Sequence, residues 1–90
     1  MNEIEIKFTP QERDLIIDHT FADPELTKRL KIAEIKGKHI VAKYSIHDLD
    51  DLLGFIAAEA NHTEDKKLEK KLDKLFDRLT RILEKEIDNQ

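Results

Sequence analysis

Hydrophobic residues recur at helical spacing over the end of the chain, from Glu64 to Gln90. On a helix of about 3.6 residues per turn they form one continuous stripe. The stripe consists of Leu68, Leu72, Leu75, Phe76, Leu79, Ile82, Leu83 and Ile87. Lysines and arginines follow one flank of this stripe, while aspartates and glutamates follow the other. The pattern predicts a long amphipathic helix with one buried face and two oppositely charged flanks.

The N-terminal residues combine a strand pattern with helix-start signals. Charged and apolar side chains alternate from Glu3 to Phe8, so one face of a strand there would be apolar. Thr9, Pro10 and Glu12 match a capping box with proline at the first helical position, which predicts a helix starting at Pro10. The segment Asp23-Pro24-Glu25 repeats the signal and predicts a second, short helix.

Two short β-prone runs lie on either side of Gly37. A hairpin that turns near residues 36–38 accounts for both runs, because glycine readily adopts the positive φ that tight turns need. Ile40, Ala42 and Tyr44 would then share one face of the second strand of this hairpin.

Helical signals resume after the hairpin. Ser45 is placed to cap a third helix that runs to about Ala60, and Thr63, followed by Glu64 and Asp65, is expected to cap the final one. Only a few residues separate these two helices, so we expect them to pack antiparallel.

The order of elements is therefore β-α-α-β-β-α-α. It predicts an α+β fold with a small antiparallel sheet and a C-terminal antiparallel helical hairpin. The length of the chain fits a single domain, residues 1–90. Residues 1–44 would form a strand, helix and hairpin part, and residues 45–90 a helical hairpin.

Charged flanks of the last two helices suggest how they align. Their complementary charges would place Glu59 near Lys66 or Lys67 and Asp48 near Arg78. Exposed ion pairs contribute only about 0.2–1 kcal/mol each, so they would select the register rather than hold the helices together.

Two apolar features suggest contact with another protein. The final helix is longer than the third, so its last apolar residues extend beyond the hairpin, and the back of the third helix carries Gly54, Phe55 and Ala58. The sheet could cover that back, which is the simpler interpretation; alternatively, both features belong to an interface. The predicted interface residues are Phe55, Ala58, Leu79, Ile82, Leu83 and Ile87.

Composition narrows the functional classes. Charged residues make up 40% of the chain and its net charge is −4, which does not favour long-range attraction to nucleic acid or anionic lipid. Cysteine is absent, so neither a disulfide framework nor a thiolate metal site is expected. The apolar runs are too short to span a membrane, and no signal peptide is evident, so we expect a soluble cytoplasmic protein.

Candidate chemistry is sparse. None of the four histidines has the spacing of a metal site, and we expect His19 to be partly buried in the core. Glu59, Asn61 and His62 form the most unusual polar cluster, which is either a ligand site or simply a turn. The only serine already serves as a helix cap, so we predict no enzyme activity and no cofactor.

Two functional hypotheses remain. The first is a protein–protein interaction or regulatory module whose partner is a second copy, through the C-terminal helices, or another protein. The alternative is contact with a nucleic-acid backbone through Lys67, Lys71, Lys74 and Arg78 on the basic flank. The net negative charge and the lack of aromatic residues among these lysines disfavour the alternative.

Overall fold

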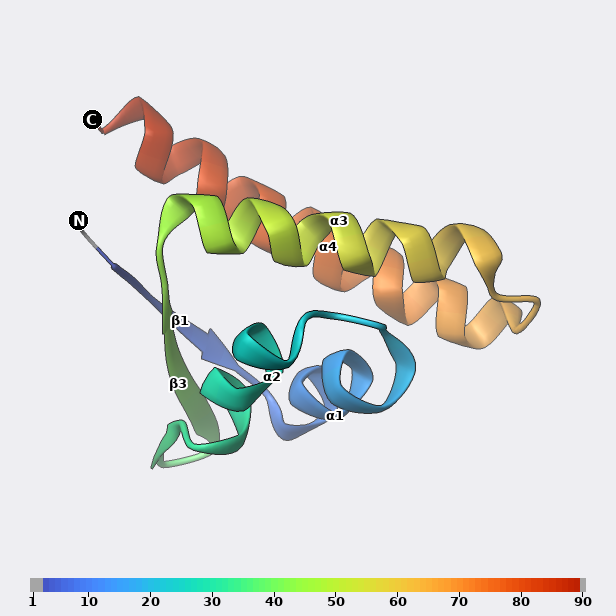
Figure 1. The fold of residues 1–90 in the computed structure, drawn as a ribbon, viewed down its shortest axis with the longest axis horizontal. Coiled ribbons are helices and arrows are strands. Elements are labelled where there is room, and N and C mark those ends of the chain that lie inside the picture. The colour runs from blue at the N-terminus through green and yellow to red at the C-terminus, as the bar shows by residue number, and fades with distance from the viewer. Residues whose placement is uncertain (1–2, 90) are drawn as a thin grey trace.

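The computed structural model describes residues 3–89, which form a three-stranded antiparallel sheet and four helices (Figure 1). In chain order the elements are β1 (Ile4–Phe8), α1 (Pro10–His19), α2 (Pro24–Lys31), β2 (Glu34–Lys36), β3 (His39–Tyr44), α3 (Ile46–His62) and α4 (Lys66–Asp88). The predicted fold class and the predicted order of elements are confirmed. The last helix ends two residues before the end of the chain, as its uninterrupted stripe indicated.

β3 is the central strand of the sheet, whose order is β1-β3-β2. Its register with β1 pairs Ile4 with Tyr44 and Phe8 with Ile40. Because side chains alternate along a strand, the apolar residues of β1 all face the helices. Glu5 and Lys7 lie on the opposite face and are exposed. The alternation predicted for β1 is therefore confirmed, and Ile40, Ala42 and Tyr44 share one face of β3 as predicted, although Val41 on its other face is buried as well.

The core lies between this sheet and the four helices. α3 and α4 pack side by side along most of their length, and the end of α4 extends past the start of α3 (Figure 1). Within the core the rings of Phe8 and Tyr44 meet edge to face, with centroids 6.4 Å apart. The fully buried side chains are Ile6, Phe8, Ile16, Leu30, Tyr44, Leu49, Leu52, Ile56, Leu72, Leu75 and Leu79.

Local capping explains most helix starts. The Thr9 hydroxyl accepts a hydrogen bond from the Glu12 N–H, and a Glu12 carboxylate oxygen accepts one from the Thr9 N–H at 2.9 Å. Asp23 and Ser45 cap α2 and α3 as predicted. Gly37 has a φ of 63°, in the left-handed region that its hairpin turn requires.

The predicted cap of the final helix is wrong by two residues. Asp65 caps α4, since its carboxylate accepts hydrogen bonds from the N–H groups of Lys67 and Leu68. Thr63 instead ends α3, which runs two residues beyond the predicted Ala60, and its N–H donates to the Glu59 carbonyl at 2.9 Å. Both residue types cap helices well, so their proximity made the boundary ambiguous.

The predicted ion pairs between the last two helices are also wrong. No ion pair joins α3 to α4 within residues 3–89. Arg78 pairs with Glu12 of α1, and Asp48 pairs with Arg29 of α2. The prediction took account of α3 and α4 only. In the structure, α1 and α2 place Glu12 and Arg29 beside the same charged flanks.

Two burial predictions fail as well. Gly54 and Ala58 are exposed, so the sheet does not cover the back of α3, although Phe55 is partly buried against the core. His19 is exposed rather than partly buried, because it lies in the last turn of α1, where the helix leaves the core.

Candidate functional site

Two arginines fasten the helices to the ends of the sheet. Arg78 donates from Nε and Nη2 to the two carboxylate oxygens of Glu12, at 2.9 and 2.8 Å, and from Nη2 to the Lys7 carbonyl at 3.0 Å. Its guanidinium also lies 5.7 Å from the centre of the Phe8 ring. The carboxylate of Glu12 is held in place by the cap of α1, so Arg78 meets a partner of fixed orientation.

Arg29 makes a similar set of contacts at the opposite end of the β1–β3 pair. It pairs with Asp48 at 3.0 Å and with Glu3 at 3.4 Å, and it donates to the Lys43 carbonyl at 3.0 Å. Its guanidinium lies 5.5 Å from the centre of the Tyr44 ring. Both arginines are thus committed to structure, with their charges matched by carboxylates.

Tyr44 is the one ionisable group with a strongly shifted pKa in the described chain. Burial raises the pKa of its hydroxyl far above the usual range, while the charge of Arg29 opposes that shift. The hydroxyl donates to the Leu26 carbonyl at 2.7 Å. A fully buried and hydrogen-bonded phenol is not accessible to a substrate. We therefore assign Tyr44 a structural role in the core.

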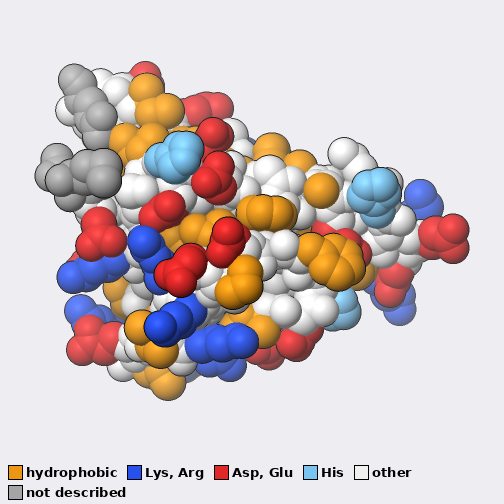
Figure 2. Space-filling model, viewed as in Figure 1, with side chains coloured by type: hydrophobic (Ala, Val, Ile, Leu, Met, Phe, Trp, Pro, Cys, Tyr) orange, Lys and Arg blue, Asp and Glu red, His pale blue; other side chains and the backbone are white. Residues whose placement is uncertain are grey.

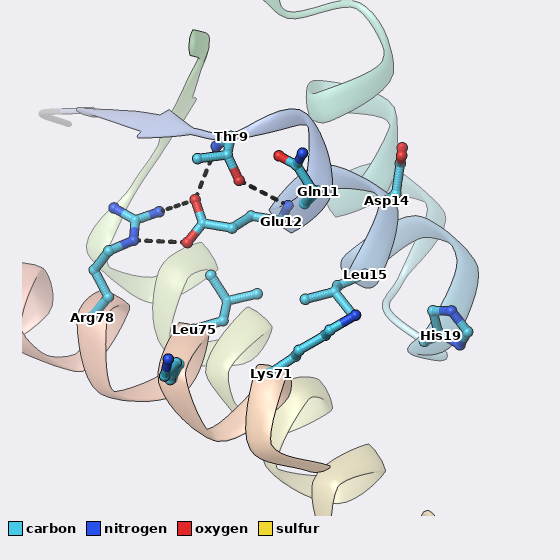
Figure 3. Close-up of a pocket in the computed structure, with 10 residues that line it drawn as sticks. Thr9, Gln11, Glu12, Asp14, Leu15, His19, Lys71, Leu75 and Arg78 are labelled. Carbon is cyan, nitrogen blue, oxygen red and sulfur yellow. Dashed lines mark hydrogen bonds and ion pairs between the residues drawn. The ribbon is translucent and has the colours of Figure 1, made fainter. Parts of the chain in front are cut away.

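A groove of about 620 Å³ runs between α1 and α4 (Figure 3). Leu15 of α1 and Leu75 of α4 supply its apolar surface, and Lys71 extends from α4 towards α1. The lining residues are Thr9, Gln11, Glu12, Asp14, Leu15, His19, Lys71, Lys74, Leu75 and Arg78. We call this feature the α1–α4 groove.

The charges in this groove are of two kinds. Arg78 and Glu12 neutralise each other at one end. Lys71 and Lys74 are exposed and have no ion-pair partner in the described part of the chain. The groove therefore combines an apolar floor with two cationic side chains that are available to a ligand.

Three of the four predicted phosphate-contact residues line this groove. Lys71, Lys74 and Arg78 lie within it, whereas Lys67 is exposed on the first turn of α4 and does not line it. Arg78 is already paired with Glu12, so it is not available as the prediction assumed. Asp14 contributes another carboxylate to the same groove.

The predicted interface residues fall into three groups. Leu79 and Leu83 are buried, with 0% and 8% of their surfaces exposed, and both belong to the hydrophobic core cluster. These two residues thus belong to the core of a single copy. Phe55 and Ile82 are partly buried against that core, whereas Ala58 and Ile87 are exposed.

The polar cluster at the end of α3 does not form a site with internal contacts. Asn61 and His62 are exposed in the last helical turn, and Glu59 is half-buried. Their side chains are joined by no hydrogen bond or ion pair in the structure of residues 3–89. Among the same residues, no three histidine, aspartate or glutamate side chains lie together in a way that could hold a metal ion.

Sequence reasoning missed the α1 wall of the groove. Leu15, Gln11 and His19 lie some sixty positions before the lysines that face them, and no local pattern links the two segments. The available signal was the basic flank of α4, which indicated one wall only. Large exposed apolar residues were also missed: Phe21, Ile32 and Ile35.

None of the described helices has both the length and the apolar character needed to cross a bilayer. Comparisons with protein-family models, with curated proteins and with solved structures find no match for this chain.

Proposed function

We propose that this protein is a non-catalytic binding module that holds an acidic, amphipathic segment of another protein in the α1–α4 groove. The observation that carries this proposal is the combination of an apolar floor, formed by Leu15 and Leu75, with the ammonium groups of Lys71 and Lys74, which have no ion-pair partner within residues 3–89. A segment with leucines on one side and glutamates beside them matches both features. Grooves between helices bind amphipathic helices in this manner.

Charge supports an acidic partner locally, although the whole chain is negative. α4 carries eight basic and six acidic side chains, so the helix that forms this wall is itself net positive. The net charge of the chain is −4, so the remaining residues are acidic overall. Electrostatic attraction of an acidic partner would therefore be confined to the groove. Such local attraction orients a bound partner rather than drawing acidic molecules to the whole surface.

A nucleic acid fits this groove less well. Glu12 and Asp14 line it together with the lysines, so a phosphate backbone that followed the groove would pass carboxylates as well as ammonium groups. On the face shown in Figure 2, acidic and basic side chains are intermingled, and no continuous basic surface extends over it. A segment with an apolar side and carboxylates beside it suits the lining of the α1–α4 groove better than a continuous polyanion does.

The test uses a synthetic helical peptide with leucines along one face and glutamates on both sides of it. Binding is followed by amide chemical-shift changes in labelled protein. We expect shifts at Leu15, Lys71 and Lys74, and little binding by a peptide in which every glutamate is lysine. Replacing both groove lysines, Lys71→Glu with Lys74→Glu, removes two attractions of about 0.2–1 kcal/mol each and adds similar repulsions. The affinity should fall about fivefold or more.

The matched control is Lys70→Glu with Lys85→Glu, which makes the same change of charge on α4 outside the groove. This control should bind the acidic peptide nearly as well as the wild type. Equal losses in the two double variants would show that only net charge matters and would refute the groove. Tighter binding of a single-stranded oligonucleotide than of the peptide would favour the alternative function.

A further inference from the structure

The outer edge of β1 carries backbone hydrogen-bonding groups that no other strand of the described residues pairs. In the described residues β1 has a strand neighbour on one side only, β3. The Lys7 carbonyl accepts its hydrogen bond from Arg78, and the Lys43 carbonyl accepts one from Arg29. Lys7 is opposite Val41, and Lys43 is opposite Glu5. The two-residue turn between Lys36 and His39 makes that pair a hydrogen-bonded one, so alternate residues of β3, Val41 and Lys43 among them, direct their backbone groups towards the β2 side. Both pairs are therefore of the non-hydrogen-bonded kind in the β1–β3 ladder.

It follows that the N–H and C=O groups of Glu5 and Lys7 point away from β3. In an antiparallel ladder both groups of one residue point to the same side, and residues alternate between the two sides. Ile4, Ile6 and Phe8 thus use their backbone groups within the sheet. Glu5 and Lys7 present theirs outward, and their side chains are exposed on the outer face.

We propose that two copies of this chain pair through their β1 edges, antiparallel, into one continuous six-stranded sheet. Within β1 only Glu5 and Lys7 point outward, so in a hydrogen-bonded pairing of two β1 strands they meet each other or themselves. With the two-fold axis at Ile6, Glu5 lies opposite Lys7 of the second copy, and Lys7 lies opposite its Glu5. Both cross-strand pairs are then attractive.

The neighbouring registers are unfavourable. A shift in one direction places Glu5 opposite Glu5 of the second copy, and a shift in the other places Lys7 opposite Lys7. Like charges directly opposite each other destabilise strand pairing. A shift by a single residue would turn the apolar side chains of the second copy to the wrong face. The order Glu5-Ile6-Lys7 therefore selects one register and one partner, a second copy of the chain.

Two other features are compatible with this pairing. The Lys7 carbonyl has two lone pairs, so it can accept from a second strand while it keeps its bond from Arg78. β2, the other edge of the sheet, has only three residues and ends at the turn around Gly37, so it offers much less edge. The apolar side chains of β1 from both copies would lie on the same face of the joined sheet.

The test is sedimentation equilibrium over a range of about 5–500 µM, because a five-residue edge supports only weak, roughly micromolar, association. The wild type should shift from one to two copies with concentration. Glu5→Lys makes both positions cationic, and Lys7→Glu makes both anionic, so each single variant should dimerise about tenfold more weakly or worse. An equimolar mixture of the two single variants should form a heterodimer, because opposite charges then meet at both pairs.

Thermal unfolding of each variant separates these effects from loss of the fold. Glu5 forms a cross-strand ion pair with Lys43 at 3.9 Å, which Glu5→Lys removes, whereas Lys7→Glu leaves every described ion pair intact. The exchange variant, Glu5→Lys with Lys7→Glu, should dimerise like the wild type. A wild type that remains a monomer throughout would overturn the proposal. So would single variants that associate as well as the wild type, or a mixture no more associated than its components.

Discussion

Replacement of Tyr44 by phenylalanine should have opposite effects at neutral and at high pH. Tyr44 has 0% of its surface exposed, and its hydroxyl donates to the Leu26 carbonyl at 2.7 Å. Near pH 7, Tyr44→Phe keeps the ring and loses that hydrogen bond, so the free energy of unfolding should fall by about 1 kcal/mol.

The sign reverses at high pH because the wild type must keep its phenol neutral in order to fold. Burial raises the pKa of Tyr44 well above its unfolded value near 10, and the hydrogen bond to Leu26 adds to the preference for the neutral form. The stability that the neutral phenol contributes is therefore complete below about pH 10. It falls by about 1.4 kcal/mol for each pH unit above that value, until the folded-state pKa is reached. Tyr44→Phe has no phenol to ionise, so its stability lacks this pH dependence. The two stability curves should therefore cross near pH 11.

Urea denaturation followed by circular dichroism at several pH values measures both curves. The chain has one tyrosine and no tryptophan, so phenolate absorbance reports on Tyr44 alone. It should appear together with unfolding and not before it. Lysines titrate in the same range, but they are shared by the wild type and the variant. Parallel stability curves, or a phenolate that forms while the helices are intact, would refute the burial argument.

Two further predictions test local and long-range features of the fold. Gly37→Ala should destabilise by about 1 kcal/mol because of its positive φ, whereas Gly54→Ala, in open space on α3, should stabilise by about 0.5–1 kcal/mol; equal urea midpoints for the two variants would contradict this. Arg78→Ala loses the Glu12 pair, a carbonyl hydrogen bond and the ring contact, so we expect a loss of about 1–3 kcal/mol. Arg81→Ala, on the same helix and exposed, should change stability by less than about 0.5 kcal/mol, and a similar melting temperature for both arginine variants would disprove the assigned role of Arg78.

Local signals in the sequence determined which segments form which elements. The capping box of Thr9 and Glu12, the alternation through β1 and the glycine at the hairpin turn each act within a few residues. Such interactions have the same partners whatever the rest of the chain does, so they can be read without a structure. The one error at a helix start came from Thr63 and Asp65, two good caps that lie close together in the chain.

Tertiary structure alone decided which charges pair and which apolar residues are covered. Complementary charge along the last two helices predicted Asp48 as the neighbour of Arg78, which instead pairs with Glu12 because α1 lies beside α4. Leu83 resembles an overhanging residue in the sequence, yet the folded chain buries it, while Ile87, one helical turn later, stays exposed. Side-chain periodicity specifies the face of a helix on which a residue lies, but it does not specify how far the neighbouring elements extend along that face. The α1–α4 groove, made by segments distant in the chain, depends on that packing.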